Sequence, residues 1–417
     1  MLLTQSNLIR GLSKREYLML RMMCFFSNNL YNVALYHIRQ YYFTEKKHLS
    51  YESNYHECKD NENYKLLQAG VSQQTMKIVD RSFKSFFALV EKARKGEYRF
   101  CDIKLPHYRP KGSLFNLVLS TNAIAIKNGC LSVPMSNTFM QIFGRNKIKI
   151  KVPERVLKYK IREIRIIPIC KGRKFKIQYV YEVESESLNL NQSETLAIDV
   201  GLENLATCIS TVGTSFIMDG RRIKSINRLW NKRRAELQNK LPKNQYTSRL
   251  IQRLTLKRNN RTNDCIKKTA RYIVNHCIEH NIGTIVCGYN LDFKRNINLG
   301  SKTNQNFTQI SFGSLRQQIE NLCERYGMKY IEQEESYTSK ASFLDLDEIP
   351  IYNADNPKKY EFNGKRITRG LYQSSDGRIV NADINGAANI LRKSSQNFDF
   401  GELGRGLLAS PLRIRLP

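Results

Sequence analysis

The sequence lacks several features that would place it in common protein classes. It has no apolar run near the roughly 18 residues that a membrane-spanning helix requires, and polar residues interrupt its first twenty positions, so we expect neither a membrane span nor a signal peptide. None of its ten cysteines forms a CxxC pair, and stretches such as TIVCGY place cysteine among apolar residues. This pattern favours buried free thiols in a reducing cytoplasm over a disulfide framework.

Acidic residues are also scarce. The 37 Asp and Glu face 68 Lys and Arg, which gives a net charge of +31. Self-repulsion at this level destabilises a compact chain unless a polyanion binds to it. Nucleic acid is the first partner to consider and a membrane surface the second. The stretch 221–271 is the most basic, with seventeen Lys and Arg, among them Lys232, Arg233 and Arg234, against only two acids.

The 417 residues are too many for one ordinary core and predict two or three domains. Residues 1–100 have mostly helical periodicity, including a helix over 72–95 with Ser72 as its cap. Residues 101–194 alternate Val, Ile and Tyr segments with Gly, Pro and Asn turns, which predicts a β-rich domain that the first few residues could join. The whole is therefore expected to be a multidomain α+β protein.

The third predicted domain spans residues 195–417. Three strands come first, then a long basic helical region, a strand (TIVCGYN), an amphipathic helix, a strand (MKYIEQEE) and a final helix. Antiparallel strands followed by βαβ units predict a mixed sheet with the topology of RNase H. We expect the inserted stretch 336–381 to consist of loops.

Two aspartates lie where this topology would bring acidic side chains together. Asp199 ends the apolar strand TLAID, where an unpaired carboxylate is costly to bury. Asp383 begins the helix of NADINGAANIL, whose glycine and alanines allow close approach to the sheet. Carboxylates converging at one point can hold the Mg²⁺ ions of phosphodiester hydrolysis, and Mn²⁺ would also fit. A solvated strand end and an ordinary helix cap are the plainer interpretations.

A third carboxylate is less obvious because the strand next to Asp199 ends at Gly288. The following strand supplies Glu334 and Glu335, and a long side chain from a neighbouring strand, roughly 4.8 Å away, can reach the space beside a glycine. Side-chain alternation allows only one of the two to do so. We favour Glu335, with Glu334 as the alternative.

Five segments resemble the TnpB-type nucleases of transposons and the compact type V CRISPR effectors. They are LAIDVGLENLAT, IVCGYN, NQNFTQISFGSLRQQIENLCERYG, EESYTSKASFLD and NADINGAANIL. The resemblance is strong over 195–394 and weaker before it, where RSFKSFF and the helix-then-sheet order are the similarities. Several motifs in the same order are far more specific than any one of them.

The resemblance implies an RNA-guided DNA endonuclease that cuts with Mg²⁺ in a RuvC-like domain. Asp199 matches the first catalytic aspartate of the family and Asp383 the last. The helical segment would be a recognition lobe and the β-rich segment a wedge domain. The partners would be a guide RNA and double-stranded DNA with a short flanking motif, in the cytoplasm of a prokaryote at the nucleoid.

The chain departs from the family at two places. Gly288 stands where the family has its second catalytic glutamate, so either Glu335 replaces it or the protein binds without cutting, as a repressor. A transposase is a more distant alternative. The insert 336–381 has no cysteine, so no zinc should bind there, and its aromatic residues would hold it by packing. The basic residues Lys365, Arg366 and Arg369 of this insert could guide a DNA strand to the metals.

Overall fold

The structure is a computed structural model that describes residues 1–145, 147–290, 309–352, 359–394 and 408–416. The chain forms two compact units, Met1–Glu184 and Ser185–Pro417. Among the described residues, no helix is long and apolar enough to cross a membrane. All ten cysteines are free, and six of them are buried.

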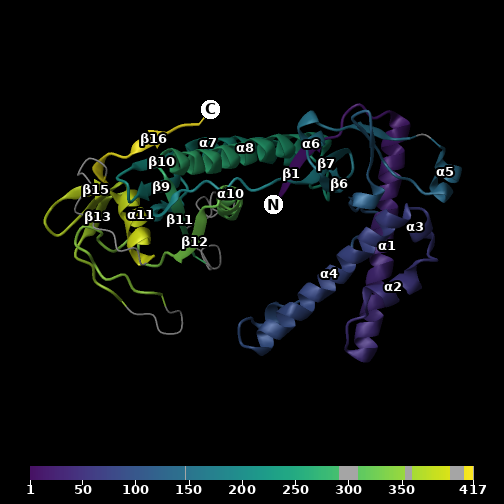
Figure 1. Ribbon diagram of the computed structural model, residues 1–417, viewed down its shortest axis with the longest axis horizontal. Coiled ribbons are helices and arrows are strands. Elements are labelled where there is room, and N and C mark those ends of the chain that lie inside the picture. Colours follow the sequence, from purple (N-terminus) through teal and green to yellow (C-terminus); the bar gives the residue numbers. More distant parts are fainter. Residues whose placement is uncertain (146, 291–308, 353–358, 395–407, 417) are drawn as a thin grey trace. The chain divides into compact units, whose positions relative to one another are not determined.

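The first unit begins with a strand and a group of helices (Figure 1). These elements are β1 (Leu2–Leu8), α1 (Lys14–Glu45), α2 (Tyr51–Cys58), α3 (Glu62–Lys65) and α4 (Ala69–Arg94). A capping box between Ser13 and Glu16 starts α1. The cap of α4 is Gln68, so the prediction of Ser72 as the cap is wrong. Ser72 is instead a buried helical residue that donates to the carbonyl of Tyr64 at 2.9 Å.

Two antiparallel sheets complete the first unit. The larger has the order β1-β7-β6-β2 and the smaller β3-β4-β5. The elements are β2 (Leu117–Ser120), β3 (Ala125–Lys127), β4 (Cys130–Ser132), α5 (Asn137–Phe143), β5 (Lys149–Lys151), α6 (Glu154–Leu157), β6 (Ile161–Ile169) and β7 (Lys174–Glu182). Leu20 of α1, Met76 of α4 and Ile166 of β6 belong to one core. Helices and sheets are thus joined in one unit, and its division into a recognition lobe and a wedge domain stays a prediction.

The second unit is built on a six-stranded sheet with the order β12-β11-β8-β9-β10-β16. Its strands are β8 (Asn191–Asp199), β9 (Asn204–Ser210), β10 (Ser215–Asp219), β11 (Ile282–Tyr289), β12 (Lys329–Glu334) and β16 (Leu412–Ile414). The first three are antiparallel neighbours, whereas β11 runs parallel to β8 and β12 parallel to β11. This is the strand order of RNase H, with the short β16 added at one edge.

Helices cover both faces of this sheet (Figure 1). They are α7 (Arg221–Gln238), α8 (Arg249–Glu279), α10 (Phe312–Tyr326) and α11 (Ala382–Lys393). Successive residues of β8 point to opposite faces. Leu196 and Ile198 pack in the core shared with α8 and α10, and Ala197 packs in the core shared with α11. The mixed α/β fold predicted for this half of the chain is confirmed.

The insert before α11 is more regular than predicted. The stretch 336–381 contains a three-stranded antiparallel sheet of β13 (Lys365–Thr368), β14 (Leu371–Gln373) and β15 (Ile379–Asn381). The prediction of loops alone is therefore wrong. Strands of three or four residues are too short to show a clear alternation of apolar and polar side chains.

Aromatic packing and one buried carboxylate hold the insert. The ring of Tyr337 lies 5.2 Å from that of Tyr360 and 6.2 Å from that of Phe362. Asp347 is only 6% exposed. Its carboxylate accepts from the backbone nitrogen of Ser342 at 2.6 Å and from the side-chain amide of Asn363 at 2.7 Å. It thus joins two distant parts of the insert.

We expect Asp347→Ala to destabilise the second unit by about 2–4 kcal/mol, because it leaves several buried donors without an acceptor. Urea unfolding followed by the fluorescence of Trp230, the only tryptophan and a residue of this unit, measures the change. The exposed Glu361 of the same insert provides the control, whose alanine variant should differ from wild type by less than about 0.5 kcal/mol. Equal stability of the two variants would contradict a structural role for the Asp347 carboxylate.

Candidate active site

Asp199 lies at the end of β8, the central strand of the sheet. Helix α11 passes so close that a Cβ atom at Gly386 would stand 2.9 Å from Oδ2 of Asp199. Burial, together with the nearby carboxylates of Glu335 and Asp383, raises the pKa of Asp199 well above its ordinary value. The glycine of α11 therefore leaves the space in which this carboxylate sits.

Glu335 follows β12 and points into the space beside Gly288. A Cβ atom at Gly288 would stand only 2.6 Å from Oε2 of Glu335. This oxygen is buried and has no hydrogen-bond partner, and burial raises the pKa of Glu335. The glycine and the glutamate are thus complementary, because a larger residue at 288 would exclude the Glu335 side chain as it stands.

Glu334 is engaged elsewhere. It accepts from the ammonium group of Lys393 and, at 2.6 Å, from the backbone nitrogen of Ser336. Burial alone would raise the pKa of Glu334, but these hydrogen bonds outweigh it and lower the pKa. Of the two glutamates, the structure brings Glu335 beside Asp199 and pairs Glu334 with a lysine.

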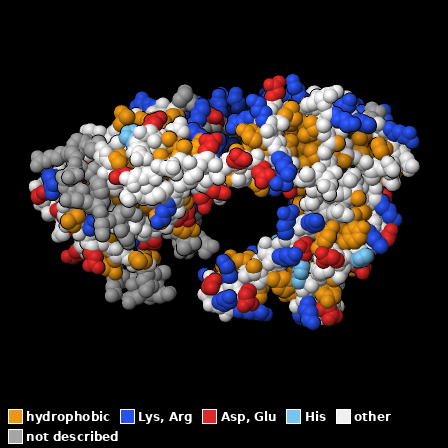
Figure 2. All heavy atoms as spheres, viewed as in Figure 1, with side chains coloured by type: hydrophobic (Ala, Val, Ile, Leu, Met, Phe, Trp, Pro, Cys, Tyr) orange, Lys and Arg blue, Asp and Glu red, His pale blue; other side chains and the backbone are white. Residues whose placement is uncertain are grey.

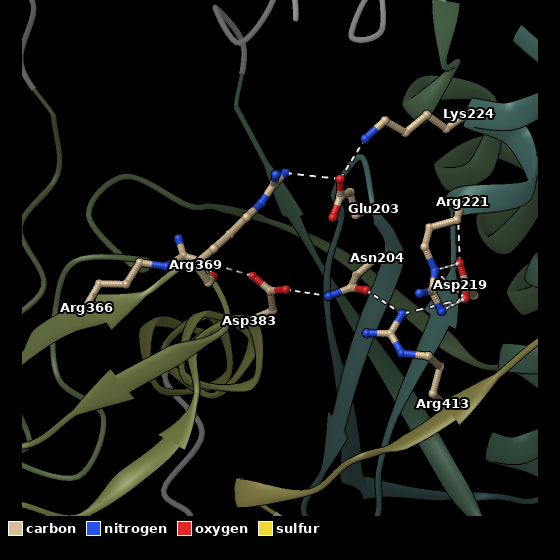
Figure 3. A network of polar contacts seen from close by, with 9 residues as sticks. All are labelled: Glu203, Asn204, Asp219, Arg221, Lys224, Arg366, Arg369, Asp383 and Arg413. Atoms are coloured by element: carbon tan, nitrogen blue, oxygen red, sulfur yellow. Dashed lines mark hydrogen bonds and ion pairs between the residues drawn. The ribbon is translucent and has the colours of Figure 1, made fainter. Parts of the chain in front are cut away.

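Asp383 lies in the first turn of α11, where Asn381 caps the helix. Its Oδ2 accepts from the side-chain amide of Asn204, and its Oδ1 lies 3.4 Å from a guanidinium nitrogen of Arg366 (Figure 3). Its carboxylate is about one-third exposed. Both of its oxygens therefore have protein partners.

Asp199 and Asp383 both line a cleft of about 520 Å³. Four arginines also line it, namely Arg221, Arg366, Arg369 and Arg413. Figure 3 shows their side chains in one polar network with Glu203, Asn204, Asp219 and Lys224. Acidic groups at the strand ends and guanidinium groups around them suit an anionic substrate.

The carboxylate oxygens of Asp199, Glu335 and Asp383 are ligands of the kind that a hard divalent cation prefers. In their present conformations the three side chains do not surround a common point. The carboxylates of Glu335 and Asp383 lie near Asp199, and the partnerless buried oxygen of Glu335 is costly without a ligand. In the described part of the chain, no three His, Cys, Asp or Glu side chains are grouped closely enough to hold a metal ion. To complete the set, Oδ1 of Asp383 would have to leave Arg366, while Oδ2 can stay with the amide of Asn204.

The other predicted basic residues lie outside the cleft. Lys365 is exposed on β13, next to Arg366. Lys232, Arg233 and Arg234 are exposed on α7, about 16 Å along the helix axis from Arg221. Figure 2 shows Lys and Arg side chains gathered where α8 runs in Figure 1. These groups can extend a positive surface away from the cleft.

Several residues of the site were missed in the sequence. Glu203 and Asn204 lie inside the LAIDVGLENLAT motif, which was a usable signal. Arg221 begins α7 and Arg413 lies on β16, and neither position had any pattern that pointed to the site. Only the pairing of β16 with β10 brings Arg413 to the cleft.

The raised pKa of Asp199 predicts a pH-dependent stability. The folded chain holds this proton more tightly than the unfolded chain, so the metal-free protein should lose stability as pH rises above the ordinary value of 3.8. Asp199→Asn removes the charge at nearly the same size. We expect it to raise the melting temperature in EDTA at pH 8, with a gain that shrinks as pH falls toward 4. The same melting temperature as wild type across this range would contradict the prediction.

Comparisons with known proteins show what the chain is similar to. Residues 178–294 match the OrfB_IS605 family, described as a probable transposase, and residues 312–390 match the Cas12f1-like TNB domain. The TnpB-like protein ORF457 of Acidianus two-tailed virus is 23% identical over 94% of this chain and 86% of its own length. The Cas12f1 chain in a complex with sgRNA and target DNA superposes with a TM-score of 0.60 at 13% identity, covering 91% of this chain and 83% of its own.

The second unit thus has the strand order of an RNase H-like domain, with Asp199 at the end of its central strand and Asp383 on the neighbouring helix α11. Over these residues the chain is similar to the TnpB-type family and to the compact type V effectors.

Proposed function

We propose that this protein is an RNA-guided DNA endonuclease that hydrolyses target DNA at a single RuvC-like site. The observation that carries the proposal is that the carboxylates of Glu335 and Asp383 lie near the buried Asp199, with one buried oxygen of Glu335 left without a hydrogen-bond partner. These three residues would hold Mg²⁺, or Mn²⁺ in its place.

A divalent cation in this site would neutralise the negative charge that develops on the phosphate during hydrolysis. The protein's own contribution is positional. Asp199 and Glu335 are fixed by β8 and the end of β12, while Asp383 is presented by α11. Arg366 and Arg369 line the same cleft and would contact phosphates of the DNA strand. Arg366 would exchange Asp383 for a phosphate when the cation binds.

The positive charge of the chain supports nucleic acid as the partner. A net charge of +31 and the exposed Lys232, Arg233 and Arg234 provide phosphate contacts for a guide RNA and a target duplex. Base pairing by the guide would select the target, and the protein would read a short flanking motif in the duplex. The related Cas12f1 structure contains both an sgRNA and a target DNA.

One observation favours a second function, a guide-dependent DNA-binding repressor that does not cut. The described carboxylates do not close around a metal, and Arg366 lies beside Asp383. A repressor would keep the basic surfaces and lose only the hydrolysis. The family description as a probable transposase adds a third, weaker candidate that joins DNA ends.

The proposal is tested by purifying the protein from its native locus and sequencing the RNA that copurifies. The complex is then incubated with Mg²⁺ and a plasmid library in which the bases flanking the guide-matched target are randomised. Cleavage of plasmids that share one flanking motif supports the endonuclease. Target binding without cutting indicates the repressor. An RNA-free protein that acts on transposon ends indicates the transposase.

A further inference from the structure

The side-chain amide of Asn204 lies between a carboxylate of the site and an arginine of the last described strand. Its Nδ2 donates to Asp383, and its Oδ1 accepts from Nη1 of Arg413 at 2.8 Å (Figure 3). A guanidinium can only donate and an ionised carboxylate can only accept. These two partners therefore fix which end of the amide faces Asp383.

Strand topology explains how the contact arises. Strand β10 has β9 on one side and β16 on the other, so Asn204 of β9 and Arg413 of β16 face each other across it. Asp219 at the end of β10 has a side chain only 8% exposed and lies 3.8 Å from Arg413. Arg221 donates to the same carboxylate through its Nε at 2.9 Å. The same nitrogen of Arg413, Nη1, therefore lies near both the Asp219 carboxylate and the Asn204 amide.

We propose that Asn204 and Arg413 are positioning residues that orient the Asp383 carboxylate for metal binding. Asn204 keeps Asp383 at the mouth of the cleft, and Arg413 keeps the amide turned so that it donates. This function assigns β16, a strand that carries none of the three carboxylates, to the active site. The inference rests on the proposed function, since it concerns the metal site of the same reaction.

The neighbouring Arg415 provides a matched control. It is an arginine of the same segment and lies 3.6 Å from the Asp219 carboxylate, but it has no contact with Asn204 among those that the structure shows. Removing either arginine costs one positive charge near Asp219. Only Arg413 contacts the amide of Asn204. A difference between the two variants therefore separates the positioning role of Arg413 from the general loss of positive charge.

The experiment compares Arg413→Met, Arg413→Lys and Arg415→Met in the full, guide-loaded chain. Mn²⁺ alone is titrated and its binding is followed by loss of the free-ion EPR signal, with guide-loaded Asp199→Ala as the baseline for ions bound by RNA. We expect Arg413→Met to weaken Mn²⁺ binding and cleavage roughly 10–100-fold, as for other residues that orient metal ligands. Added Mn²⁺ should restore part of the cleavage. In Arg413→Lys the lysine can still donate a hydrogen bond to Asn204. Both Arg413→Lys and Arg415→Met should therefore bind Mn²⁺ and cut nearly as well as wild type.

Two outcomes would overturn the proposal in different ways. In the first, the wild type binds Mn²⁺ and cuts, and either Arg413→Met does the same or Arg415→Met loses as much Mn²⁺ binding and cleavage as Arg413→Met. This outcome would exclude the positioning role and leave the proposed function intact. In the second, the wild type binds target but shows no cleavage and no Mn²⁺ binding above the Asp199→Ala baseline. This outcome would overturn both the proposed function and the positioning role. Thermal unfolding of each variant, followed by Trp230 fluorescence, separates these results from misfolding.

Discussion

Replacing Asp199 by alanine should abolish DNA cleavage while leaving guide and target binding unchanged. Asp199 is the carboxylate on the central strand, and burial together with the carboxylates of Glu335 and Asp383 raises its pKa. A bound metal contributes several kcal/mol to stabilising the transition state, so losing one of its ligands should cost about 1,000-fold in rate. Binding depends on phosphate contacts spread over the basic surfaces and should not change.

Single-turnover cleavage and filter binding on the same guide-loaded preparation measure the two properties separately. Asp376→Ala serves as the control, because Asp376 is an exposed aspartate whose hydrogen bonds and ion pair are local to its own turn. It should cut at the wild-type rate. Asp199→Ala that cuts like wild type would exclude Asp199 from the catalytic site, whatever its effect on stability.

Placing a glutamate at position 288 should restore part of the cleavage that is lost when the glutamate at position 335 is removed. Glu335→Ala should lose cleavage by roughly 100–1,000-fold, since it removes one of the three proposed ligands. Gly288→Glu alone should also lose cleavage, because its Cβ would stand 2.6 Å from Oε2 of Glu335 and 2.8 Å from Cδ1 of Ile390. Combining Gly288→Glu with Glu335→Ala removes the first collision.

Adding Ile390→Val removes the second collision, because valine lacks the Cδ1 atom. We expect this triple variant to recover roughly tenfold in cleavage over Glu335→Ala, which is a coupling of about 1.4 kcal/mol. Glu334→Gln is the matched control and should cut nearly as wild type, since Glu334 is paired with Lys393. Loss in Glu334→Gln with full activity in Glu335→Ala would reverse the assignment of the two glutamates.

Much of the second unit could be predicted from local patterns. Apolar runs that end in turns located β8 and β11, and the amphipathic spacing located α10. Strand and helix periodicities depend on neighbours a few residues away, so they are visible in the sequence. The short strands of the insert have too few residues for this, and the small β16 gave no signal at all.

By itself the sequence determined the excess of basic residues and the RNase H-like strand order, and it predicted three candidate carboxylates. It also determined that the insert lacks the thiolates of a zinc site. Charge, periodicity and residue type are all properties of the chain, and no tertiary contact is needed to recognise them.

Only the tertiary structure decided how those carboxylates are surrounded. Lys393 pairs with Glu334, so Glu335 is the glutamate that lies beside Gly288. Arg413 reaches Asn204 although 209 positions separate them in the chain. Strand pairing and helix packing set such contacts, and both depend on residues far apart in sequence. No local pattern encodes which distant side chain will meet which carboxylate.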